Sequence, residues 1–198
     1  MDSFLTISKP ALAEFSDRGS KFLAYSYPVQ SKGEIKVHIS TLKKEHFKAV
    51  HHCFAYRLGY TGDEFRVADD GEPSGSAGRP ILGQIDSRQL TNVLVVVVRY
   101  FGGTLLGVPG LINAYKSATA AALESSATVS RPILIGYRLE FDYTIMNEIM
   151  RVVKSLDCII VKQDLQLFCT MEIGVPKINN ENFKERMSKL QGLKTSLL

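Results

Sequence analysis

The sequence predicts an α+β protein of two domains, residues 1–130 and 131–198, because the pattern of apolar residues changes between them. The first part contains an unbroken apolar run, Val93–Val98, which is typical of a central strand covered on both faces. In the second part, strands show strict alternation of apolar and polar residues, which is typical of a sheet with one face in solvent. The segment 126–132 between the two patterns is predicted to be the linker.

The elements of the first domain follow from turn, cap and periodicity signals. Asp17-Arg18-Gly19 separates two strand patterns and predicts a hairpin. Ser31 and Glu34 form a capping box before apolar residues at helical spacing. In chain order, the predicted elements are a hairpin at 11–16 and 21–27, a helix at 31–46, strands at 51–56 and 64–68, a short helix from Pro80, the strand 93–98 and a helix at 111–125.

The second domain is predicted to have the order β-α-β-β-α-β. Thr144 is expected to cap its first helix, whose apolar residues recur at helical spacing. In chain order, the elements are a strand at 133–143, a helix to residue 156, strands at 158–162 and 165–175, a helix after Asn180 and a strand at 193–198. This order is the split β-α-β, or ferredoxin-like, plan.

The composition is that of a globular protein, with 45% hydrophobic and 22% charged residues. No apolar run is long enough to span a bilayer, and the first residues lack the pattern of a secretory signal, so we expect a cytoplasmic protein with no membrane partner. Cys53, Cys158 and Cys169 lie in apolar segments without CxxC spacing. This placement favours buried thiols over disulfides or a thiolate metal site.

The net charge of +4 is spread evenly along the chain. Residues 1–130 carry 14 basic and 12 acidic residues, and residues 131–198 carry 10 and 8. A nucleic-acid-binding protein usually has a concentrated basic face. The linear sequence contains none, although such a patch could assemble from scattered residues.

Two glycine-rich loops each lead into a predicted helix, residues 71–78 before Pro80 and residues 102–110 before Leu111. The N-terminus of a helix offers unpaired N–H groups and a positive dipole end, and glycines let an anion approach the backbone. Neither loop has the lysine of a P-loop, and G-x-G-x-x-G is absent. The loops are candidates for a phosphate site; the alternative is that their glycines serve tight turns and helix–sheet packing.

Arg99 follows the apolar run and is expected to be partly desolvated, so its guanidinium requires carboxylates or a bound anion. Asp69, Asp70 and Glu72 follow a strand of the same predicted sheet and are the candidate partners. Two interpretations stay open, an ion pair that holds the loop to the sheet and direct contact with a ligand, and both can hold.

Two pairs of residues suggest chemistry that their spacing does not support. His51 and His52 are neighbours on a predicted strand, so they point to opposite faces and cannot share a metal ion; we expect one to face the core and the other the site. Ser74 and Ser76 lie in a glycine-rich turn, but the G-x-S-x-G elbow of a hydrolase is absent. The sequence predicts no metal site and no cofactor.

Long, ordered motifs of the chain resemble one family. Its D-D-G-E-P-x-G-T-A-G-x-P block corresponds to Asp69–Pro80, and its R-H-H-C segment corresponds to Val50–Cys53. Its V-V-R-Y-x-G-G…L-G…G-L…A-Y signature corresponds to Val97–Gly103, Leu106-Gly107, Gly110-Leu111 and Ala114-Tyr115. On these motifs the chain is identified as a bacterial member of the IMPACT/YigZ family.

The resemblance implies an N-terminal α/β sandwich with the left-handed β-α-β fold of a ribosomal-protein domain and of some small-molecule kinases. It also implies a C-terminal ferredoxin-like domain similar to one in the translocating elongation factor. In those kinases a glycine-rich loop before a helix holds phosphate, which supports the phosphate site by fold analogy. Eukaryotic members modulate translation through a kinase pathway, with an additional N-terminal domain that this chain is expected to lack, so the resemblance implies a link to translation or RNA only.

The preferred hypothesis is a non-enzymatic binding protein linked to translation or its regulation, with RNA, the ribosome, translation factors or another phosphate-bearing ligand as partner. One alternative is a small-molecule enzyme that acts on a phosphorylated or nucleotide substrate with Asp70, Glu72, Arg99 and a histidine. Another is a protein-interaction module that uses the solvent face of the second domain. The candidate ligand-binding residues are His51, His52, Asp69, Asp70, Glu72, Ser74, Ser76, Arg99, Tyr100, Gly102, Gly103, Gly107 and Tyr115.

Overall fold

A computed structural model describes all 198 residues of the chain. The residues form two compact units. The first unit comprises residues 4–131, and the second unit comprises residues 132–198 together with residues 1–3. No helix is long and apolar enough to cross a membrane.

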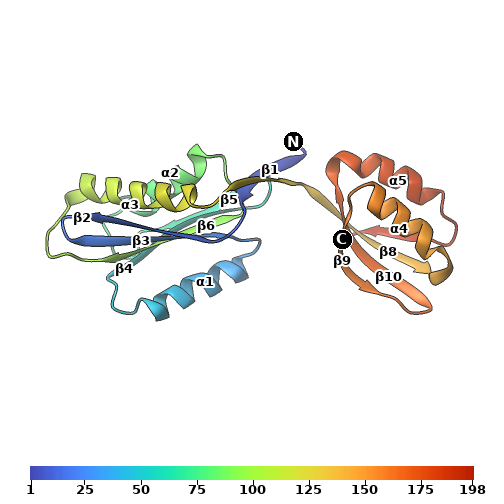
Figure 1. Ribbon diagram of the computed structural model, residues 1–198, viewed down its shortest axis with the longest axis horizontal. Helices are drawn as coiled ribbons and strands as arrows, with labels where there is room; N and C mark the ends of the chain where they lie inside the picture. Colours follow the sequence, from blue (N-terminus) through green and yellow to red (C-terminus); the bar gives the residue numbers. More distant parts are fainter. The chain divides into compact units, whose positions relative to one another are not determined.

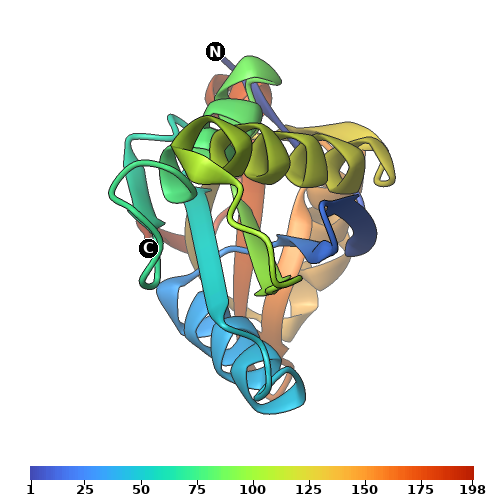
Figure 2. The ribbon, with the colours of Figure 1, turned by 90° about the vertical axis from the view of Figure 1, so that its left-hand side faces the viewer.

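The first unit is built on a five-stranded sheet in which every neighbouring pair is antiparallel. Helix α1 covers one face, and α2 and α3 cover the other (Figures 1 and 2). In sheet order the strands are β2 (Ala11–Asp17), β3 (Ser20–Pro28), β6 (Val93–Tyr100), β4 (His51–Leu58) and β5 (Glu64–Ala68), and the helices are α1 (Lys32–Glu45), α2 (Gly78–Ser87) and α3 (Gly107–Glu124).

The central strand β6 explains why its sequence shows no alternation. Val93, Val95 and Val97 pack into the core under α2 and α3, whereas Leu94, Val96 and Val98 pack into the core under α1. All six side chains are buried, so both faces of this strand require apolar residues. The prediction of a central strand with both faces covered is confirmed.

Helix α1 begins where its capping box places it. The side chain of Ser31 accepts a hydrogen bond from the backbone N–H of Glu34 at 3.2 Å. This bond satisfies one of the N–H groups that the first turn leaves unpaired. Strands β3 and β4, which α1 connects, lie on either side of β6 and run parallel to each other, since both are antiparallel to it.

The segment expected to be the linker is partly a strand. β7 (Thr128–Pro132) pairs with β1 (Ser3–Ile7) in a two-stranded sheet, and the N–H of Ser8 donates to the carbonyl of Ala127 at 2.9 Å. The two compact units divide between residues 131 and 132, within the segment predicted to be the linker, and most of that segment is extended as β7. The partner strand lies more than a hundred residues away, so local sequence carried no signal for this pairing.

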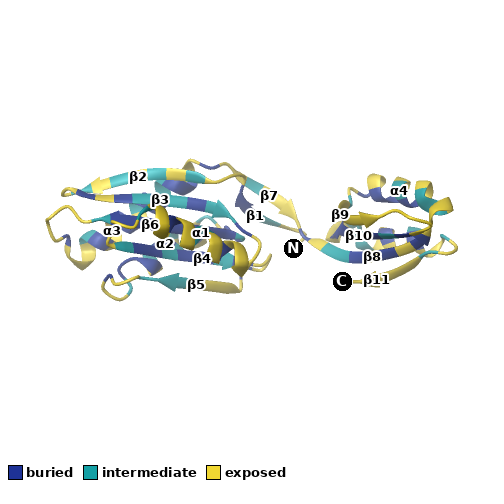
Figure 3. Ribbon diagram, turned by 90° about the horizontal axis from the view of Figure 1, so that it is seen from below, coloured by how far each residue is buried: buried dark blue, intermediate teal, exposed yellow.

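The second unit has the expected β-α-β-β-α-β order. Its four strands form an antiparallel sheet in the order β11-β8-β10-β9, which brings together the first and third strands at the centre. Figure 3 shows buried residues along the central strands and exposed ones along β9 and β11. The elements are β8 (Leu134–Asp142), α4 (Met146–Ser155), β9 (Ile159–Asp164), β10 (Phe168–Pro176), α5 (Asn180–Ser188) and β11 (Lys194–Leu197).

The helix cap predicted in the second unit differs from the observed one. The carboxylate of Asp142 accepts from the N–H of Thr144 at 2.9 Å and caps a short 3₁₀ turn, Tyr143–Ile145, which precedes α4. Aspartate competes well for such a position because its charged oxygen is a stronger acceptor than a hydroxyl. Thr144 is thus the donor to the cap and does not cap the helix itself.

Candidate functional site

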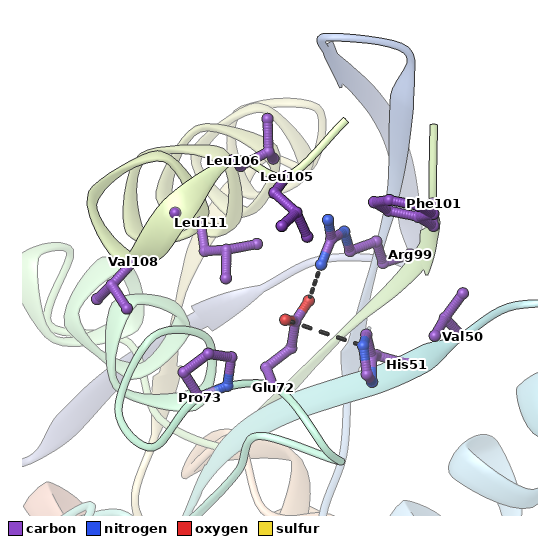
Figure 4. Close-up of a pocket in the computed structure, with 11 residues that line it drawn as sticks. Val50, His51, Glu72, Pro73, Arg99, Phe101, Leu105, Leu106, Val108 and Leu111 are labelled. Atoms are coloured by element: carbon purple, nitrogen blue, oxygen red, sulfur yellow. Dashed lines mark hydrogen bonds and ion pairs between the residues drawn. The ribbon is translucent and has the colours of Figure 1, made fainter. Parts of the chain in front are cut away.

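A pocket of about 350 Å³ lies in the first unit, where the ends of β4 and β6 meet the start of α3. Three ionisable side chains line it, His51, Glu72 and Arg99. Figure 4 shows the Glu72 carboxylate between Arg99 and His51, with Val108 and Leu111 of α3 across the pocket from them. Several of the predicted site residues converge here.

The register of the sheet brings His51 and Arg99 together. The two residues are direct partners in the antiparallel pairing of β4 with β6, and the N–H of Val50 donates to the carbonyl of Arg99 at 2.9 Å. Paired residues point to the same face of a sheet. His51 and Arg99 therefore both face α2 and α3, while His52 is buried on the opposite face.

A buried carboxylate joins the polar residues of the pocket into one network. Oε1 of Glu72 accepts from Nη1 of Arg99 at 2.6 Å and from the hydroxyl of Tyr115 at 2.7 Å. The side chains of Arg99 and Glu72 are only 6% and 3% exposed, so this ion pair is almost completely desolvated. Nε of Arg99 is also buried and has no hydrogen-bond partner.

The second oxygen of Glu72 faces His51, with 3.8 Å between Oε2 and Nε2. The other ring nitrogen, Nδ1, lies 2.8 Å from the carbonyl oxygen of Asp70. Because a carbonyl can only accept, Nδ1 carries the proton, and in the neutral ring Nε2 is the nitrogen free to accept. Gly71 permits this arrangement, since it adopts a φ of +94° and an added Cβ would lie 3.2 Å from Nδ1.

Tyr115 and Cys53 extend the network below the pocket. The Sγ atom of Cys53 lies 3.3 Å from the hydroxyl of Tyr115 and 3.0 Å from the carbonyl oxygen of Asp69. Burial raises the pKa of the Cys53 thiol to about 12, and burial together with the neighbouring Cys53 and Glu72 raises the pKa of Tyr115. Both groups stay protonated, so Tyr115 serves as a hydrogen-bond donor and Cys53 is not a nucleophile.

The N-terminus of α2 is occupied by the protein's own carboxylate. Asp69 accepts from the backbone N–H groups of Gly75, Ala77 and Gly78 at 2.9, 3.1 and 2.8 Å. Burial opposes ionisation of Asp69, but these three hydrogen bonds outweigh it and hold its pKa below the usual value. An internal anion thus uses the donors of loop 71–78, which favours the alternative that this loop serves the turn and the start of α2.

The N-terminus of α3 differs because no side chain caps it. The helix begins at Gly107, four residues before the expected start, so Gly107 and Pro109 lie in its first turn. Proline is tolerated there because the first N–H groups of a helix have no partner within it. Gly107 and Val108 line the pocket, which places this positive end of the helix beside Arg99.

The loop from β6 to α3 is held by a close backbone contact at Gly102. An added Cβ at Gly102 would lie 2.0 Å from the carbonyl carbon of Gly19, and the Gly102 N–H donates to Oγ of Ser20 at 3.1 Å. Gly103 adopts a φ of +87° with open space around it. Gly102 is therefore required for packing against the β2–β3 turn, and Gly103 for the backbone conformation.

Several predicted residues point away from the pocket. The carboxylate of Asp70 binds Nζ of Lys43 at 3.0 Å and the N–H of His52 at 2.7 Å, and these contacts hold its pKa low against the opposing effect of burial. Burial lowers the pKa of the His52 imidazole. Tyr100 lies on the α1 face, where its hydroxyl is 2.9 Å from Nδ1 of His46. These residues join the loop and α1 to the sheet.

The two serines show no arrangement for nucleophilic catalysis. Oγ of Ser76 is buried and donates to the carbonyl of Pro73 at 2.6 Å, which stabilises the turn. Ser74 is exposed, and no hydrogen bond joins it to a histidine. No group of three or more His, Cys, Asp or Glu side chains is placed to hold a metal ion.

Sequence reasoning missed the apolar rim of the pocket. Phe101, Leu105 and Val108 are 48%, 83% and 46% exposed, although apolar side chains of this size are usually buried. The available signal was their position in or next to the glycine-rich segment 102–110, which shows no core pattern. An apolar rim around buried polar groups is typical of small-molecule and nucleotide sites.

Comparison with known proteins identifies the family. The Impact N-terminal domain model matches residues 18–123, which contain the whole pocket. The chain is 30% identical over 190 residues to the IMPACT family member YigZ of Escherichia coli K12, with 95% of this chain and 93% of that protein covered. It is 29% identical over 197 residues to the IMPACT family member YvyE of Bacillus subtilis 168, with 100% and 91% covered.

A solved structure agrees with the fold over the whole chain. The crystal structure of a hypothetical protein, 28% identical, has a TM-score of 0.78 and covers 100% of this chain and 98% of its own. The sequence likeness and the structural likeness thus extend over both units. The chain belongs to the IMPACT family.

Proposed function

We propose that the protein is a non-enzymatic binding protein that holds a phosphate group of RNA, or of another phosphate-bearing ligand, in the pocket at the start of α3. One observation carries the proposal. The guanidinium of Arg99, whose Nη2 makes no hydrogen bond within the protein, lines the same pocket as the uncapped N-terminus of α3. Such donors, fixed in position before a ligand arrives, are what an anion requires.

RNA is the favoured ligand class because of the apolar rim. Phe101 lies at the mouth of the pocket, and its ring centre is 5.7 Å from Cζ of Arg99. Unpaired RNA bases stack on exposed aromatic rings, while phosphates bind arginine and backbone N–H groups. The pocket therefore offers an aromatic ring to the base of a nucleotide and hydrogen-bond donors to its phosphate.

The link to translation rests on family membership. Eukaryotic members, by the resemblance described above, modulate translation, and RNA is the phosphate-bearing component that every translation complex contains. We place this protein in translation or its regulation on that basis. The ribosome and translation factors are the corresponding candidate partners.

The proposal is tested by adding a negative charge at Val108, an exposed residue in the first turn of α3. Aspartate there favours the helix, since a negative charge complements its N-terminus, but it competes with an incoming phosphate. Val108→Asp is expected to weaken RNA binding by about 3- to 10-fold. Val108→Asn tests shape without charge and should weaken binding less.

A second control places the same charge elsewhere. Val37 of α1 is 62% exposed and lies outside the pocket, so Val37→Asp should leave RNA binding unchanged. Wild-type binding should fall as salt is raised, because phosphate contacts release counterions. Equal RNA affinity of Val108→Asp and wild type, or binding of neither RNA nor nucleoside monophosphates by the wild type at low salt, would contradict the proposal.

One observation favours a second candidate, an enzyme acting on a phosphorylated or nucleotide substrate. The Nδ1 of His51 is held by a carbonyl and the residue lines the pocket, so in the neutral ring Nε2 is the nitrogen that could accept a proton from a bound substrate, as a general base does. Incubation with phosphorylated metabolites and nucleotides, followed by detection of products, tests it. Turnover that His51→Gln abolishes while ligand binding persists would favour the enzyme over the binding protein.

A further inference from the structure

We propose that the pocket recognises a terminal phosphate, a phosphomonoester at an RNA end or on a single nucleotide, in preference to an internal phosphodiester. The inference rests on the proposed function and narrows it to one chemical class. It follows from the depth of the donors, their arrangement across the pocket and the size of the cavity.

The depth of the donors is the first observation. Arg99 is 5% exposed and still lines the cavity, so a phosphate reaches its guanidinium only by entering the pocket. An internal phosphodiester carries a nucleotide on each side, and both would have to enter with it. A terminal phosphate has a single ester bond and can enter first, with the rest of the ligand behind it.

Hydrogen-bond donors lie on two sides of the pocket. Figure 4 shows Arg99 with Glu72 and His51 on one side and the start of α3, marked by Val108, on the other. Nη1 of Arg99 donates to Glu72, whereas Nη2 makes no hydrogen bond within the protein and no side chain caps α3. A phosphomonoester presents three terminal oxygens and about −1.5 to −2 charge, so it can accept from both sides at once. A diester has two such oxygens and one charge.

The size of the cavity agrees with one nucleotide. Its volume of about 350 Å³ lies near the lower end of the range for small-molecule sites. The 5.7 Å between Cζ of Arg99 and the Phe101 ring is short enough for a single nucleotide to bridge, with phosphate inside and base at the rim.

The experiment compares ligands that differ only at their ends. A short single-stranded RNA of one sequence is prepared with a 5′-phosphate, with a 3′-phosphate, and with hydroxyls at both ends, and its affinity for the full-length protein is measured. At least one phosphorylated form is expected to bind about tenfold tighter than the hydroxyl form. Val108→Asp should remove most of this preference, and Val37→Asp should retain it.

Competition by nucleoside monophosphates identifies the source of the phosphate. Displacement of the phosphorylated RNA by a monophosphate, but not by the matching nucleoside, supports recognition of the monoester itself; weak displacement together with end-dependent RNA binding supports an RNA end as the ligand. Equal affinity for all three RNAs would overturn this inference and leave the proposed function standing. Absence of binding to any of the RNAs and to the monophosphates would overturn both.

Discussion

At the scale of single residues, the pair formed by Glu72 and Arg99 determines both the stability and the chemistry of the pocket. Their side chains are 3% and 6% exposed and 2.6 Å apart. Removing one partner of such a buried pair leaves an uncompensated charge, whereas removing both does not. The pair therefore connects the loop after β5 to the end of β6. Comparing variants that lack one partner with a variant that lacks both separates the effect of the pair on stability from its effect on ligand binding.

We predict that Arg99→Met lowers the free energy of unfolding by about 3–5 kcal/mol, because Glu72 then stays buried and charged. The double variant Glu72→Met with Arg99→Met is expected to be more stable than the single variant. Urea unfolding of the wild type, both single variants and the double variant measures the coupling. Additive losses in the double variant would show that the pair is not coupled in this way.

The carboxylate of Asp69 leads to a prediction about pH. Its pKa is lowered in the folded protein, so its contribution to stability is present above the unfolded-state value of about 4 and is lost as the pH falls through the folded-state pKa. Asp69→Asn is expected to cost about 1–3 kcal/mol at pH 7, because three N–H groups lose a charged acceptor. In thermal unfolding below about pH 4, the difference in stability between Asp69→Asn and the wild type should become smaller. A constant difference between pH 7 and pH 3 would contradict this assignment.

At the scale of elements, the connection from β6 to α3 contains two neighbouring glycines that are required for different reasons. Gly102 touches the backbone of the β2–β3 turn, where an added Cβ would lie 2.0 Å from the carbonyl carbon of Gly19. An added Cβ at Gly103 would meet no atom, so only the positive φ of this residue favours glycine there. Glycine is therefore required at 102 because there is no room for a side chain, and at 103 because of the backbone conformation.

We expect Gly102→Ala to destabilise the first unit by at least the 1–3 kcal/mol of an overpacked site, since backbone on both sides must move. Gly103→Ala is expected to cost about 1 kcal/mol through its φ of +87° alone. Thermal unfolding and RNA binding of both variants distinguish the two costs. If Gly103→Ala were the more damaging variant, the contact with Gly19 would not be the reason for glycine at 102.

At the scale of the whole molecule, each unit has its own hydrophobic core. The first unit contains two, one on each face of its sheet, and the second contains one between its helices and its sheet. The pocket, its network and the start of α3 all lie in the first unit. Binding of a terminal phosphate should therefore need the first unit alone.

We predict that a fragment of residues 1–132, which keeps both strands of the β1–β7 pair, unfolds cooperatively and retains the preference for phosphorylated RNA ends. Circular dichroism during heating and the RNA affinities of the fragment test this. A folded fragment that no longer distinguishes the RNA ends would show that the second unit contributes to recognition.

The sequence by itself determined the features that repeat locally. The unbroken run of β6, the Ser31 capping box and the β-α-β-β-α-β order of the second unit were all visible from periodicity, since residues a few positions apart share a face or a turn. The opposite directions of His51 and His52 followed from the same alternation.

Only the tertiary structure decided which donors are available to a ligand. The Asp69 carboxylate takes the amides of α2, Tyr115 reaches Glu72 from 43 residues away, and Gly102 touches the turn after β2. These contacts join segments that are distant in sequence, and a residue type alone does not reveal whether its hydrogen bonds are already made within the protein. Sequence could therefore propose two anion sites, but the folded chain fills the one at α2 with its own carboxylate and leaves the one at α3 without a cap.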